Sequence, residues 1–145
     1  SYKNYSKKLL FICKKKPISL EVFADDFNQM IKQAKTINSW GKNVYVKVPV
    51  TNSKGKFMGE VIKSLNKNKI KLNITAVYTS IQTKQILKNI DKRTKVIISI
   101  FAGRMADTGK DPINFTGIHK RVAFVVTQDD SSTVLAGLDK ILYRS

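Results

Sequence analysis

Residues 44–50 of the chain read Val-Tyr-Val-Lys-Val-Pro-Val, an apolar run with one lysine at its centre. Its side chains alternate with the period of two that is typical of a β-strand. Lysine is rarely buried without a reason, and an amine shielded from water favours its neutral form, which is the nucleophile that Schiff-base chemistry needs. The run therefore predicts a strand that carries Lys47 as a candidate catalytic amine.

Three further runs, at residues 18–24, 71–77 and 95–102, repeat this pattern and alternate with helix-like segments. One parity of each run is apolar, whereas the other carries Glu21, Asn73, Thr75 and Ser99. The polar positions on successive runs lie 24 to 28 residues apart, about the length of one βα unit in an eight-stranded barrel. The sequence predicts an α/β protein, part of a (β/α)8 TIM barrel, whose parallel strands gather these side chains around Lys47.

Each candidate has a simpler interpretation. A single polar residue on a strand usually makes a structural hydrogen bond, and Glu21 alone can be an ion-pair partner of Lys47. Recurrence at one parity on four strands favours function. Arg104 directly follows a predicted strand, where barrels build their active sites, and arginine beside a serine hydroxyl is typical of phosphate sites. That Arg104 is simply exposed in a loop is an equally favoured interpretation.

Composition narrows the class of protein. The 145 residues, 42% hydrophobic, suffice for one domain with a core. No apolar run approaches the roughly 20 residues of a membrane span, and neither a signal peptide nor a disulfide is expected, which favours a cytoplasmic protein. The net charge of +17 suggests nucleic acid as a binding partner. Because the lysines are scattered along every predicted helix and loop, solvated surfaces are favoured over nucleic-acid binding.

Four motifs occur together in one order. They are Ile18-Ser-Leu-Glu-Val-Phe-Ala-Asp-Asp26, Asn43-Val-Tyr-Val-Lys-Val-Pro-Val-Thr-Asn52, Leu72-Asn-Ile-Thr-Ala76, and Ser99-Ile-Phe-Ala-Gly-Arg104 followed by Ala106-Asp-Thr-Gly109. Over about residues 1–112 the chain resembles the transaldolase family, including its small fructose-6-phosphate aldolase-like members. The resemblance implies a class I aldolase (β/α)8 barrel that transfers a three-carbon ketol unit between phosphorylated sugars with no metal or organic cofactor.

The resemblance also implies a role for each candidate. Lys47 matches the lysine that forms the Schiff base, Glu21 the acidic residue that helps position a catalytic water, and Thr75 the hydroxyl that holds this water. Asn73 matches a substrate contact, and Phe101 an aromatic residue that lines the pocket. Ser99 and Arg104 match the phosphate-binding pair.

Two departures from the family are expected to matter. The family's opening strand with its proton-shuttling aspartate, and the following Thr-Thr-Asn-Pro strand, have no counterpart here. Residues 113–145 match poorly, with 113–139 standing where a helix belongs and 140–145 resembling the opening of strand seven. We expect residues 1–145 to form one incomplete domain, strands three to six plus a stub of strand seven, that is weakly active or inactive alone. The alternatives are a non-catalytic piece that self-associates through exposed strand edges or complements another chain, and a simple ketose-phosphate aldolase.

Overall fold

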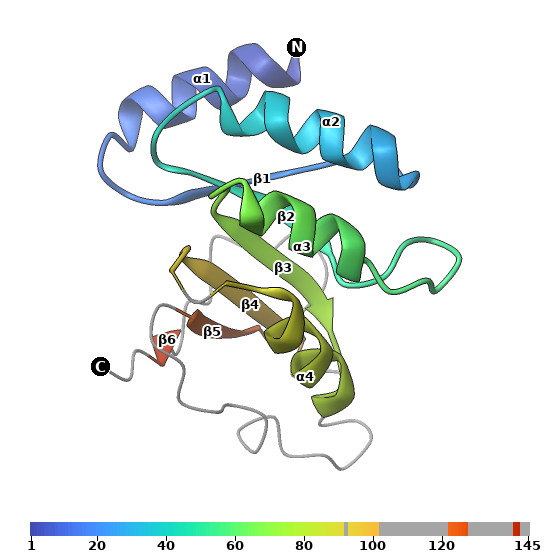
Figure 1. Cartoon of the computed structure of the whole chain (residues 1–145). Coiled ribbons are helices and arrows are strands. Elements are labelled where there is room, and N and C mark those ends of the chain that lie inside the picture. The colour runs from blue at the N-terminus through green and yellow to red at the C-terminus, as the bar shows by residue number, and fades with distance from the viewer. Residues whose placement is uncertain (92, 102–121, 128–140, 143–145) are drawn as a thin grey trace.

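Strands and helices alternate as far as Phe101 in a computed structural model that describes residues 1–91, 93–101, 122–127 and 141–142 (Figure 1). The elements are α1 (Tyr2–Ile12), β1 (Ile18–Glu21), α2 (Phe27–Asn38), β2 (Val44–Pro49), α3 (Gly59–Lys67), β3 (Leu72–Val77), α4 (Ser80–Asn89), β4 (Val96–Phe101), β5 (Val122–Thr127) and β6 (Ile141–Leu142). The predicted α/β arrangement is confirmed, because four parallel strands alternating with helices form part of a (β/α)8 barrel.

The strands lie in one sheet in the order β1-β2-β3-β4-β5-β6. All neighbours from β1 to β5 are parallel, as right-handed βαβ units require. The register aligns Glu21 with Lys47, and Lys47 with Asn73. Polar residues of one parity are therefore side by side on three adjacent strands.

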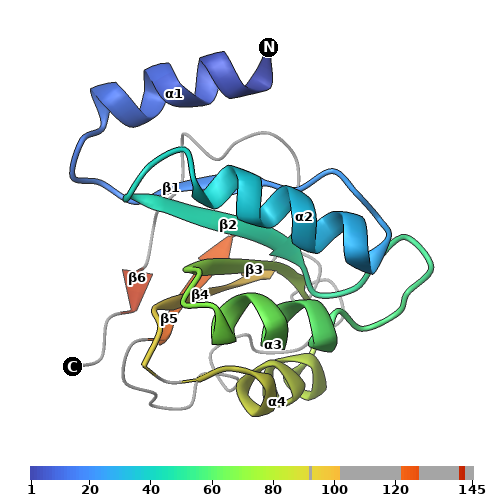
Figure 2. The ribbon, with the colours of Figure 1, turned by 45° about the horizontal axis from the view of Figure 1, so that its top comes forward.

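The core lies on the helix-covered face of the sheet. In β2, Val44, Val46 and Val48 are completely buried, whereas the intervening residues are half-buried. Figure 2 shows α2, α3 and α4 on one side of the sheet. Asp26 is the N-cap of α2, and its carboxylate accepts a hydrogen bond from the Gln29 N–H at 3.0 Å. The apolar parity seen in the sequence thus marks the packed face.

α1 lies at the β1 end of the sheet (Figures 1 and 2). The Tyr2 hydroxyl accepts a hydrogen bond from the backbone N–H of Glu21 at 2.9 Å and lies 3.5 Å from the carbonyl oxygen of the same residue. The Tyr2 ring packs edge-on against Phe23 and Trp40. Gln33 accepts hydrogen bonds from the backbone N–H groups of Phe23 and Ala24, both at 2.9 Å. Side chains thus engage part of the β1 edge that faces away from β2.

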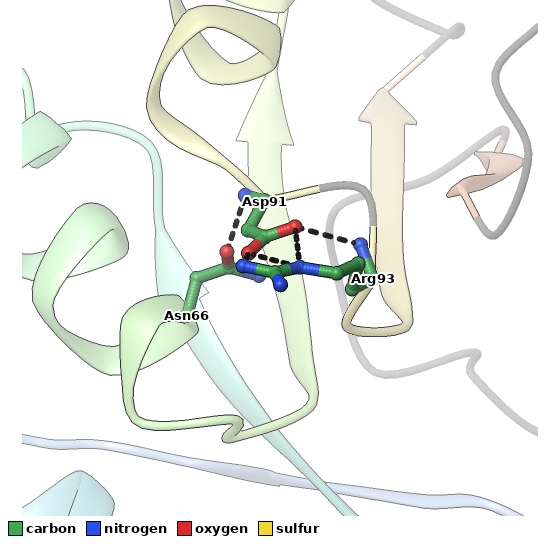
Figure 3. A network of polar contacts seen from close by, with 3 residues as sticks. All are labelled: Asn66, Asp91 and Arg93. Atoms are coloured by element: carbon green, nitrogen blue, oxygen red, sulfur yellow. Dashed lines mark hydrogen bonds and ion pairs between the residues drawn. The ribbon is translucent and has the colours of Figure 1, made fainter.

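A polar network joins the end of α3 to the loop that enters β4 (Figure 3). The Asn66 side chain is almost completely buried, and its amide oxygen accepts a hydrogen bond from the backbone N–H of Asp91. The Asp91 carboxylate accepts hydrogen bonds from both the Nε and the Nη2 of Arg93, at 2.9 and 2.6 Å. These charge-assisted bonds hold the pKa of Asp91 below its ordinary value.

The last strands differ from the expected barrel continuation. Residues 122–127, within the poorly matching segment 113–145, form strand β5, parallel to β4. Residues 141–142, expected to open strand seven, pair antiparallel with β5 instead of continuing the parallel order. A chain that turns back pairs antiparallel, whereas a parallel strand needs a crossover that returns it to the other end of the sheet. The strand stub is therefore present, but not with the direction of a barrel strand.

Candidate active site

Lys47 and Glu21 form an ion pair on the face of the sheet opposite the core. The Lys47 Nζ lies 3.6 Å from the Glu21 Oε2, and the two side chains are 29% and 45% exposed. The sequence predicted a buried lysine, but Lys47 is only half-buried because it belongs to the parity that faces away from the helices. The expected neighbour is present, so an amine and a carboxylate lie next to each other on this face.

Asn73 links three strands across this face. Its Nδ2 donates a hydrogen bond to the Ser19 Oγ on β1 at 2.9 Å, and its Oδ1 accepts one from the Ser99 Oγ on β4 at 2.8 Å. Because Asn73 aligns with Lys47 in the register, this chain of hydrogen bonds crosses the sheet beside the amine. Two serines thus fix the Asn73 amide. Sequence reasoning did not select Ser19, although it shares the polar parity of Glu21.

None of the described residues pairs with the buried hydroxyl of Thr75. The residue is 4% exposed, and its Oγ1 makes no hydrogen bond to the residues that the structure describes. A buried hydroxyl left unpaired costs about 1–3 kcal/mol. The site therefore contains a buried polar group whose hydrogen-bonding capacity no described residue uses.

A β-bulge is formed by Thr75 and Ala76. The register between β3 and β4 shifts between Ile74 and Val77, and Ala76 has a φ of +58°. A left-handed conformation is costly for a residue with a Cβ, and bulges near active sites often redirect a side chain. Ile74 and Val77 are both buried, so the extra residue places Thr75 and Ala76 together between two core positions.

The remaining candidates lie towards the ends of β3 and β4. Ser99 is 7% exposed and Phe101 is half-buried. The Phe101 ring packs edge-on against Tyr78, with ring centroids 5.4 Å apart. Tyr78, which the sequence analysis did not select, is thus a neighbour of Phe101. Arg104 lies outside the described residues.

Two loops are joined beyond the ends of β1 and β2. The Asp25 carboxylate accepts hydrogen bonds from the Ser53 backbone N–H and hydroxyl, both at 2.7 Å. These bonds lower the pKa of Asp25 from its ordinary value, with a smaller contribution from the charge of Lys54. The contact holds the loops that follow Glu21 and Lys47 against each other.

The described residues form neither a cluster that could hold a metal ion nor a helix that could span a membrane. No group of three or more histidine, cysteine, aspartate or glutamate side chains is arranged to hold a metal ion. No helix in the same part of the chain combines the length and apolar character needed to cross a bilayer. The ionisable groups gathered on the polar face are an amine and a carboxylate.

Comparison with known proteins identifies similar sequences. The family model described as transaldolase/fructose-6-phosphate aldolase matches residues 3–128. Probable transaldolases from Nitrosopumilus maritimus and Streptococcus equi subsp. zooepidemicus are 36% and 35% identical over 97 and 96 residues, covering 67% and 66% of this chain and 40% and 41% of theirs. A probable transaldolase from Dehalococcoides mccartyi is 29% identical over 127 residues, 85% of this chain and 55% of its own. The chain thus spans about two fifths to just over half of these relatives.

Proposed function

Because this chain belongs to the transaldolase/fructose-6-phosphate aldolase family, we propose that Lys47 forms a Schiff base with the carbonyl group of a ketose phosphate. The observation that carries the proposal is the pairing of an amine with a carboxylate 3.6 Å away on a polar sheet face. The reaction is the transfer of a three-carbon ketol unit between sugar phosphates.

The chemistry proposed for Lys47 needs a neutral amine and controlled proton transfer. The Nζ attacks the carbonyl carbon of the ketose, and the carbonyl oxygen leaves as water, which gives an iminium. The bond between C3 and C4 of the ketose phosphate then breaks and its electron pair passes to the iminium. The C4 hydroxyl gives its proton to a base, and the fragment that contains C4 leaves as an aldehyde phosphate. The resulting enamine adds to the aldehyde carbon of the acceptor, and water then releases the product.

The neighbouring residues have complementary proposed roles. Glu21 and the unpaired Thr75 hydroxyl position the water that moves protons near the Nζ. Asn73, whose amide is fixed by two serine hydroxyls, contacts the substrate hydroxyl groups. Phe101 lines the pocket, and Ser99 and Arg104 bind the phosphate. Support for these roles comes from polarity, burial and family membership.

Borohydride trapping tests the proposal directly. The chain is incubated with fructose 6-phosphate or dihydroxyacetone, and borohydride delivers hydride to the iminium carbon, which converts a Schiff base into a stable secondary amine. Peptide mass spectrometry should locate the tag on Lys47, and Lys47→Arg should abolish it.

A second lysine provides the matched control. Burial, followed by the nearby charge of Lys95, lowers the pKa of Lys71, so this amine is the natural competitor for nonspecific tagging. We expect Lys71→Arg to leave the tag unchanged. Equal tagging of the wild-type chain and Lys47→Arg would disprove the assignment.

A simple ketose-phosphate aldolase is the alternative within the same chemistry. Such an enzyme releases dihydroxyacetone from fructose 6-phosphate without an acceptor aldehyde, whereas ketol transfer requires erythrose 4-phosphate. Release of free dihydroxyacetone at the same rate with and without the acceptor would favour the simple aldolase.

A non-catalytic role in assembly is the other alternative. Its support is that β1 stands at one end of the strand order and, among the described strands, pairs only with β2. Exposed strand edges recruit further strands, but Tyr2 and Gln33 already engage part of the β1 edge. Size-exclusion chromatography over a concentration series tests self-association, and a monomer at every concentration would count against it.

A further inference from the structure

A lysine stands immediately before, or two residues before, each of the first four strands. These residues are Lys16, Lys42, Lys71 and Lys95, preceding β1, β2, β3 and β4. Because the four strands are parallel and adjacent, their starts share one edge of the sheet (Figure 1). We call these four lysines the amino-edge row. It lies at the opposite end of the strands from Thr75 and Phe101.

Contacts between neighbouring strands link the row. The Asn43 Nδ2 donates a hydrogen bond to the Lys16 carbonyl oxygen at 3.0 Å. The Lys71 Nζ donates to the Lys42 carbonyl oxygen and lies 5.2 Å from the centre of the Tyr45 ring. Lys95 is close enough to Lys71 for the two ammonium groups to repel each other. The lysines of the row, except half-buried Lys71, are exposed.

Among the described residues, the row has few acidic neighbours. Of the acidic residues within the described ranges, Glu21, Asp25, Asp26 and Glu60 lie at or beyond the carboxyl ends of the strands. Asp91, which precedes β4, is already bound by Arg93 (Figure 3). In this part of the chain the ion pairs are Lys47–Glu21 and Arg93–Asp91, so neither involves the row. An external anion can therefore supply the missing charge.

We propose that the amino-edge row binds the phosphate backbone of single-stranded nucleic acid. A line of cations suits a linear polyanion, and lysine ammonium groups act as point charges that accept phosphates without requiring a defined base sequence. Neighbouring strands are about 4.8 Å apart and twist, so the row is short and curved. A flexible single strand can follow this path, whereas a duplex is stiff. The proposal is independent of the reaction proposed at Lys47.

Two charge-matched variants test the row against the general positive charge of the chain. The edge variant is Lys16→Gln/Lys42→Gln/Lys95→Gln. The control variant is Lys32→Gln/Lys63→Gln/Lys84→Gln, with one exposed lysine changed on each of α2, α3 and α4. Both variants lose three of the 17 net positive charges. Fluorescence anisotropy measures the binding of a labelled oligothymidine of about 12 nucleotides, within the range that one small domain covers.

The salt dependence of binding is the deciding quantity. Each phosphate neutralised on a single strand contributes roughly 0.7 to the slope of log K against log salt, so the edge variant should have a slope shallower by roughly 2. The slope for the control variant should change by less than half as much as the slope for the edge variant. Borohydride tagging of Lys47 should be unchanged in both variants. Urea midpoints verify folding, and if the edge variant unfolds, Lys42→Gln and Lys95→Gln are compared singly with Lys63→Gln.

Three results would overturn the proposal. Equal losses in the edge and control variants would mean that the chain binds only through its overall charge. Absence of binding to the oligothymidine at low salt would remove the site altogether. Equal or tighter binding of a duplex, or of polyglutamate, would refute the commitment to a single-stranded phosphate backbone.

Discussion

Replacing Thr75 by valine removes one buried oxygen atom while keeping a branched side chain of similar shape. The hydroxyl is inaccessible to solvent and makes no hydrogen bond to the described residues, and the residue is 4% exposed. An unpaired buried hydroxyl costs about 1–3 kcal/mol, and binding a water recovers part of this. We therefore expect Thr75→Val to raise the free energy of unfolding by about 1 kcal/mol.

The same change should weaken the chemistry. If the hydroxyl holds the water that moves protons at Lys47, its removal should slow borohydride trapping by at least about tenfold, because positioned proton transfer commonly contributes 10²-fold or more. Stability is measured from urea denaturation at constant m value, and tagging from a time course of peptide mass spectra. Opposite signs for stability and reactivity are the distinctive expectation.

A second buried threonine provides the control. Thr83 is 2% exposed, and its hydroxyl donates a long hydrogen bond, 3.4 Å, to the Thr79 carbonyl oxygen one helical turn earlier. Thr83→Val should lower stability by up to about 1 kcal/mol and leave tagging unchanged. Destabilisation by Thr75→Val would mean that its hydroxyl has a partner, and unchanged tagging would refute its role in holding the water.

The bulge and the loop contact give two further predictions. Ala76→Gly should stabilise the chain by up to about 1 kcal/mol, because glycine adopts a positive φ without strain. The control, Ala34→Gly inside α2, should destabilise it by about 1 kcal/mol. If urea denaturation shows that both variants change stability in the same direction, Ala76 is not strained. The pKa of Asp25 is lower in the folded chain than its ordinary value of 3.8. Its contact with Ser53 therefore stabilises the fold above that pH, and this stabilisation is lost as the pH falls through the lowered pKa. Ser53→Ala should reduce the loss of stability below about pH 4, and urea titrations in which this loss is unchanged would count against the contact.

The alternation of the sequence was enough to predict the first four strands and their packed face. Val44, Val46 and Val48 are buried as expected because a period of two places them together against the helices. The same parity identified Lys47 and Glu21 as neighbours, since polar residues at one spacing on parallel strands meet across a shared face.

Other features depend on tertiary contacts that local sequence does not encode. The Asn73 side chain reaches Ser19, 54 positions away, by crossing over β2, and no local pattern marks that pair. The bulge at Ala76 carries no glycine or proline signal. The burial expected for Lys47 is only partial, because its apolar neighbours in sequence occupy the other face of the same strand. The lysines before the strands looked scattered until the parallel order aligned them.

The Tyr2 hydroxyl makes the addition of a further strand next to β1 less favourable. An incoming strand would need the Glu21 N–H that Tyr2 now occupies, and it would also displace the ring from Phe23 and Trp40. A strand that adds to β1 on this side must therefore replace the existing contacts of Tyr2, and the free energy gained by pairing is reduced by the loss of those contacts. An added strand must therefore bind the backbone of β1 more strongly than the first turn of α1 does.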